Sequence, residues 1–153
     1  MILTIGAILA VAVVAFGAYV RLAPIDAARW HIDPSSVASP GSSGWLMRAD
    51  QGDAAGSVFT DTPEVVLAAL NDIALATPRT KGIAGSVEEG RITYMTRSRL
   101  WGFPDFTTVQ IVPGEGGASV AALARSRFGE SDMGVNRARL EAWDAALRQR
   151  LPD

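Results

Sequence analysis

The sequence contains no cysteine and a single histidine, and these shortages exclude several kinds of chemistry. A chain without cysteine forms no disulfide, offers no thiolate nucleophile and has no cysteine-ligated metal site. The one histidine, His31, lies in a different part of the sequence from the polar serines near residue 130, which disfavours a Ser-His-Asp triad. Because imidazole is nearly absent and carboxylates are sparse, we expect no metal site and no other cofactor.

Charged side chains are absent from residues 1–20, and this stretch is predominantly apolar. About twenty apolar residues at helical rise match the thickness of the hydrocarbon core of a bilayer. A secretory signal would begin with a basic segment and have a shorter apolar core, so the pattern favours an uncleaved span over a signal peptide. We therefore expect residues 1–21 to be a transmembrane anchor and the protein to be a single-pass membrane protein.

The side of the membrane that holds the rest of the chain is indicated by only two residues. Arg21 and Arg29 follow the span directly, and the positive-inside rule then favours the cytoplasm. The periplasmic side stays open as the alternative.

The segment after the span, residues 22–56, is rich in Pro, Ser, Gly and Ala. This composition is typical of a tether, and we expect a linker over these residues. Trp30 interrupts the polar composition. It either anchors in the bilayer interface or docks onto the folded domain.

The remainder, residues 57–153, is expected to form an α+β domain. One helix begins at Thr62-Pro63 and ends before Pro78, and another begins between Asp132 and Val135. Strands are expected over residues 80–87, 92–98, 107–112 and 118–127, with a short possible strand at 58–59. Short turns, one of them containing Glu115, make neighbouring strands antiparallel. We predict an antiparallel sheet of four to five strands with two helices on one face, preceded by one transmembrane helix.

Arginines are concentrated in the second half of this domain. The whole chain has a net charge of −2, which argues against nucleic acid as a partner, but residues 91–139 contain seven arginines and four acids. Strand alternation places Arg97 and Arg99 on one side, and Arg125 and Arg127 on the side of Leu123. If helices cover the other side of the sheet, these four guanidinium groups lie on its open face.

A polar motif follows the last strand, and it carries a resemblance to a known family. The pattern is Ser-Arg-x-Gly-x-Ser-Asp-x-Gly-x-Asn-x-x-Arg, formed by Ser126, Arg127, Gly129, Ser131, Asp132, Gly134, Asn136 and Arg139, with Gly102-Phe103-Pro104-Asp105 upstream. Over residues 56–151 the chain resembles the bacterial and plastid family known as domain of unknown function 1499. The resemblance implies a shared fold, and it brings no established activity or catalytic residues.

Two interpretations of this motif remain open. In the first, an anion site is formed by backbone N–H groups at the start of the last helix and by polar side chains: Arg97, Arg99, Arg125, Arg127, Asn136 and Arg139. In the second, the motif is a brace in which Asp132 caps the helix and pairs with Arg127 or Arg139. The residues expected to shape the motif are Asp105, Ser126, Gly129, Asp132 and Gly134.

The function that these features favour is a membrane-anchored binding or accessory module with an arginine site for an anion. The partners expected are the membrane itself and an anionic small molecule, a lipid headgroup or a membrane protein. A structural protein of the envelope, a lipid-binding domain of the helix-grip type and an enzyme are the alternatives. Catalysis would depend on Asp105, Glu130 or Asp132 as acid or base, and an enzyme is favoured less than a binding module.

Overall fold

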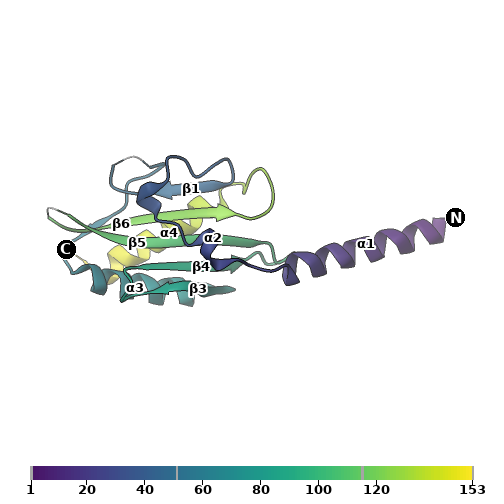
Figure 1. The fold of residues 1–153 in the computed structure, drawn as a ribbon, viewed down its shortest axis with the longest axis horizontal. Helices are drawn as coiled ribbons and strands as arrows, with labels where there is room; N and C mark the ends of the chain where they lie inside the picture. The colour runs from purple at the N-terminus through teal and green to yellow at the C-terminus, as the bar shows by residue number, and fades with distance from the viewer. Residues whose placement is uncertain (1, 51, 115, 153) are drawn as a thin grey trace.

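The computed structural model describes residues 2–50, 52–114 and 116–152, and it divides into a protruding helix and a layered domain (Figure 1). Met1, Gln51, Glu115 and Asp153 lie outside the described residues, so the expected turn at Glu115 is described only by the strand ends that flank it.

The first helix, α1 (Ile2–Leu22), extends away from the domain along the long axis of the molecule (Figure 1). Its segment Thr4–Leu22 has a mean hydropathy of 2.1, and only 6% of the apolar window is buried in the molecule. Ile8 and Val14 are 66% and 71% exposed, so no other part of the described chain covers them. The helix is therefore long and apolar enough to cross a membrane, as a single span or as a signal sequence.

The domain is built on an antiparallel sheet. Four strands follow one another as a meander: β3 (Thr80–Ser86), β4 (Arg91–Arg97), β5 (Pro104–Gly114) and β6 (Gly117–Ser126). Two shorter strands pair with β6, namely β1 (Gly44–Met47) and β2 (Val58–Phe59), and the order along the sheet is β1-β6-β5-β4-β3. The α+β prediction is confirmed, with the larger strand number explained by β1, which the sequence did not indicate.

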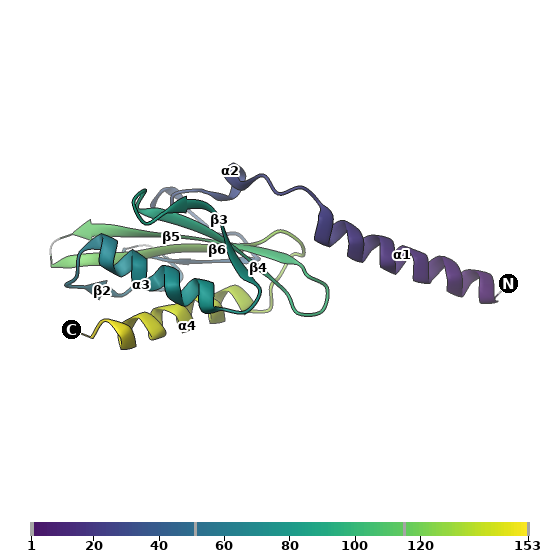
Figure 2. The same ribbon diagram turned by 90° about the horizontal axis from the view of Figure 1, so that it is seen from below.

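The two long helices of the domain, α3 and α4, cover one face of the sheet (Figure 2). Helix α3 (Pro63–Ala76) is capped by Thr62, whose side chain accepts a hydrogen bond from Val65 N, and α4 (Val135–Arg150) packs beside it. The Tyr94 and Trp143 rings meet edge to face at 5.6 Å. The residual cavity between the helices and the sheet measures about 10 Å³, too small for any lipid. This packed layer does not support the helix-grip alternative with an enclosed ligand.

The segment that was expected to be a tether packs partly on the opposite face of the sheet and partly pairs with its edge. Residues 22–56 contain α2 (Ala27–Trp30), a short 3₁₀ helix η1 (Pro34–Ser36) and β1. Trp30 stacks on Phe106 with ring centroids 4.0 Å apart, and the Trp30 carbonyl accepts a hydrogen bond of 2.8 Å from Thr108 Oγ1. His31 Nδ1 lies 2.8 Å from Thr93 Oγ1. The expected linker over residues 22–56 is thus corrected: the second face of the sheet is apolar enough to bind this segment, and Trp30 takes the docked position.

Candidate functional site

The polar motif forms a closed network between the sheet and the start of α4. Asp105 on β5 lies opposite Ser126 on β6, and its Oδ1 accepts a hydrogen bond of 2.7 Å from Ser126 Oγ. Its Oδ2 accepts one of 2.9 Å from Arg139 Nη2, and the two side chains of this ion pair are only 12% and 9% exposed. Arg139 Nη1 also donates to Asn136 Oδ1 at 2.7 Å. Asn136 and Arg139 face inward, as the helical spacing predicted, and the acid that pairs with Arg139 is Asp105 rather than Asp132.

Asp132 has a different role, at the beginning of α4. Its Oδ1 accepts a hydrogen bond of 3.1 Å from the backbone N–H of Gly134, and its Oδ2 accepts one of 2.7 Å from that of Asn136. These are N–H groups that a helix start leaves without partners. Gly134 has a φ of +81° and Gly129 a φ of +91°, which favour glycine at both bends of the loop. The N-cap position itself is Gly134, and the Asp132 carboxylate supports the helix start from two residues before it.

Two other predicted arginines, Arg97 and Arg127, bind backbone carbonyl groups where the chain leaves α1. Arg97 Nη1 donates to Gly102 O at 2.7 Å and to Val20 O at 3.3 Å, and its Nη2 donates to Arg21 O at 3.1 Å. Arg127 Nη1 donates to Pro24 O at 3.0 Å. These contacts hold the end of α1 against the domain.

Arg125 fastens the next segment of the chain. Its Nη2 donates to Trp30 O at 3.1 Å, and its guanidinium carbon lies 5.0 Å from the centroid of the Trp30 ring. Burial, and next the charge of Arg29, lower the pKa of Arg125. Arg125 and Arg127 thus lie on the predicted side of the sheet, where they hold the N-terminal segment.

A basic cavity of about 470 Å³ opens beside the end of α1. The lining residues are Arg21, Arg79, Thr80, Lys81, Met95, Arg97, Ser98, Arg99 and Gly102. Five of them are cationic and none is acidic, so the cavity concentrates positive charge. Of the predicted site residues, only Arg97 and Arg99 lie here, while Asn136 and Arg139 belong to the buried network.

Sequence reasoning missed three cationic residues of this cavity, Arg21, Arg79 and Lys81. Lys81 could have been found, because the β3–β4 hairpin places it opposite Met95, on the strand that leads to Arg97. Arg79 adopts a left-handed φ of 62° just before β3, and its Nε donates to Arg97 O at 3.0 Å. No pattern in the sequence indicates that Arg21 folds back to the same place.

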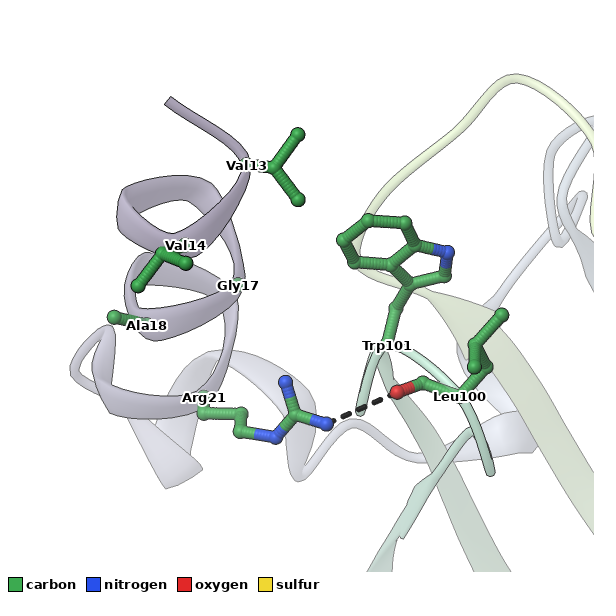
Figure 3. A pocket seen from close by; sticks show the side chains of 7 residues that line it. All are labelled: Val13, Val14, Gly17, Ala18, Arg21, Leu100 and Trp101. Carbon is green, nitrogen blue, oxygen red and sulfur yellow. Dashed lines mark hydrogen bonds between the residues drawn. The ribbon is translucent and has the colours of Figure 1, made fainter. Parts of the chain in front are cut away.

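An apolar groove shares Arg21 with the basic cavity, and Figure 3 shows the side chains that line this groove. It measures about 440 Å³ and is lined by Val13, Val14, Gly17, Ala18, Arg21, Leu100 and Trp101. Arg21 Nη2 donates to Leu100 O at 3.0 Å, which joins α1 to the β4–β5 loop. The Phe16 and Trp101 rings meet edge to face at 6.2 Å. The end of α1 and this loop therefore form one surface.

Two of the three carboxylates considered for catalysis, Asp105 and Asp132, are occupied by structural hydrogen bonds. A third cavity, of about 290 Å³, is lined by Asp105, Ser126 and Asp132 among others. Both oxygens of Asp105 and both of Asp132 accept hydrogen bonds from the brace. Among the described residues, no three His, Cys, Asp or Glu side chains are grouped to bind a metal. The geometry of this region fits a brace better than an acid–base pair.

Comparison with known proteins places the chain in a family. A search of curated proteins gives no match. Among solved structures, the chain is similar to protein CV1439 from Chromobacterium violaceum, with 17% identity and a TM-score of 0.47 over 72% of this chain and 99% of that one. The family model described as "Protein of unknown function (DUF1499)" matches residues 31–147, which include β1 as well as the motif. The chain therefore belongs to the DUF1499 family of proteins of unknown function.

Proposed function

We propose that this protein is a membrane-anchored binding module whose basic cavity binds an anionic group at the membrane surface. The observation that carries the proposal is the composition of the cavity, five cationic side chains with no acid, beside the end of an apolar helix. Guanidinium groups suit phosphate and carboxylate groups because they donate parallel hydrogen bonds. Without a ligand these like charges repel one another, so an anion would stabilise the fold.

The anchor in this proposal is α1, retained as a single span. Side chains of the domain bind its last turn: Arg97 donates to the carbonyls of Val20 and Arg21, and the Tyr19 and Phe128 rings meet at 6.3 Å. Val20 is only 1% exposed. A helix that the domain binds in this way is part of the folded unit, which favours a retained span over a removed signal. The arginines that follow it favour the cytoplasmic side.

The cavity residues differ in what they can offer to a ligand. Arg97 is half-buried and already donates to three carbonyl groups, so it contributes mainly charge. Lys81 and Arg99 are exposed and line the cavity, so their donors can reach an incoming anion. We therefore assign binding to Lys81 and Arg99, and positioning to Arg97.

Thermal unfolding of the full chain in a neutral detergent tests this function. Inorganic phosphate should raise the Tm above that in chloride at equal ionic strength, since a ligand at ten times its Kd adds about 1.4 kcal/mol. The double variant Lys81→Gln/Arg99→Gln should lose most of the rise. A matched control is Arg137→Gln/Arg150→Gln, which removes two exposed charges from α4. Equal phosphate effects in all three proteins would contradict the proposal.

A further inference from the structure

We infer that the anion is the headgroup phosphate of an anionic phospholipid from the surrounding bilayer, and that one of its acyl chains lies in the groove between α1 and the β4–β5 loop. This inference rests on the proposed function of the basic cavity and names its ligand. The two hollows together would hold a single amphiphilic molecule.

The two hollows share one lining side chain. Arg21 lines both of them, and the β4–β5 loop supplies a wall to each: Leu100 and Trp101 to the groove, Ser98 and Arg99 to the cavity. The hydrogen bond from Arg21 Nη2 to Leu100 O holds the guanidinium group against the β4–β5 loop (Figure 3). A phosphate in the cavity and a hydrocarbon chain in the groove would therefore meet at Arg21.

The groove runs in the direction that an acyl chain takes. Its helical residues, from Val13 to Arg21, lie on one face of α1, and the eight helical steps between these two residues cover about 12 Å. If α1 crosses the bilayer, this face leads from the headgroup level at Arg21 into the hydrocarbon at Val13. Gly17 leaves the middle of the groove open, since a Cβ there would meet only Arg21 Nη1, at 3.6 Å.

The loop that closes the groove has the composition of a membrane interface. Leu100 is 77% exposed and Trp101 is 38% exposed, an unfavourable position for both in water. Tryptophan prefers the bilayer interface, with its ring at the headgroup level. Phe103 in the same loop contacts Phe16 of α1, and Phe128, which lies against Phe103, contacts Tyr19 of α1. An exposed apolar loop beside cationic side chains fits the charge and polarity of an anionic lipid better than those of a soluble anion.

Quenching of tryptophan fluorescence by brominated lipids tests the inference on the full chain in bilayers. Brominated acyl chains quench a tryptophan on contact, and a Trp101→Phe variant identifies the signal of Trp101. Brominated phosphatidylglycerol should quench Trp101 at a lower mole fraction than brominated phosphatidylcholine. We expect a ratio of at least roughly fivefold, the factor for one cation at an anionic surface, because two cations are assigned to the headgroup. Lys81→Gln/Arg99→Gln should bring this ratio close to one.

A substitution in the groove separates the lipid from a soluble anion. Gly17→Leu fills the groove and should reduce the quenching preference, while the phosphate-induced rise in Tm persists. Gly6→Leu is the matched control on the same helix, because nothing lies within 4 Å of a Cβ built there. Equal quenching by both lipids, together with a phosphate-induced rise in Tm, would contradict a lipid ligand but not the anion site. A quenching preference that persists in Gly17→Leu would contradict the placement of the acyl chain in the groove. If the parent protein shows neither the quenching preference nor the phosphate-induced rise in Tm, the proposed function fails as well.

Discussion

Replacing Arg139 with alanine removes the cation of the buried network and leaves Asp105 without its ionic partner. Both side chains are about nine-tenths buried, so water compensates the abandoned carboxylate poorly. Breaking a buried ion pair by removing one partner typically costs about 3–5 kcal/mol. Asn136 Oδ1 loses a donor at the same time. Since 1 kcal/mol shifts the Tm of a domain of this size by roughly 3–4 °C, we expect the Tm to fall by about 10 °C or more.

Thermal melts of the full chain in detergent, followed by near-ultraviolet circular dichroism, measure this effect. Arg137→Ala is the control, because it breaks an exposed pair with Glu141 on the same helix, where the side chains are 57% and 48% exposed. Such a pair contributes only about 0.3–0.5 kcal/mol. The double variant Arg139→Met/Asp105→Leu should recover part of the loss, because it buries no unpaired charge. If Arg139→Ala and Arg137→Ala destabilise the protein equally, the network does not brace the fold.

Three further predictions concern the N-terminal segment. Arg97→Gln should speed backbone hydrogen exchange at residues 20–26 by roughly tenfold, because a hydrogen bond from a charged donor contributes about 1.5 kcal/mol. An unchanged exchange rate would show that Arg97 does not hold the end of α1. A chain beginning at residue 57 should aggregate on gel filtration, whereas a chain beginning at residue 23 should elute as a folded protein. Only the longer chain covers Phe106 and pairs β6 with β1. Equal elution of the two chains would refute a structural role for β1. Burial, and next the charge of Arg91, lower the pKa of His31 below its ordinary 6.5, so the unfolded state binds more protons. The free energy of unfolding should be constant above pH 6.5 and fall as the pH drops below 6.5, and it should fall less in His31→Gln. Equal losses in the two proteins would contradict a role for the contact of His31 with Thr93.

Much of the domain could be predicted from local patterns. Strand alternation separated Tyr94, which lies against the helices, from Met95, which lies on the other face. The apolar spacing of the last helix placed Asn136 and Arg139 inward, and the glycine-bearing turns predicted the antiparallel meander. Each of these patterns depends on the side-chain periodicity of a single helix or strand, and it can be recognised without knowing which element packs against that helix or strand.

The parts that escaped prediction depend on long-range pairing. Strand β1 is only four residues long and its partner β6 lies about 80 residues away, so neither length nor alternation revealed it. The choice of Asp105 as partner of Arg139 depends on the register of β5 and β6 and on the placement of α4. Arg97 and Arg127 bind backbone carbonyls, which every residue has, so their partners leave no mark in the sequence.

The central claim is that the basic cavity binds an anionic group, and Lys81 allows the most direct measurement of it. Lys81 is the one lysine in the sequence, so NMR of the full chain labelled with ¹³C,¹⁵N-lysine gives a single side-chain signal from the cavity. Titration with inorganic phosphate at constant ionic strength should move this signal along a saturable curve, and Arg99→Gln should weaken the apparent affinity. A small linear drift, equal to that in chloride and unchanged in Arg99→Gln, would contradict the claim.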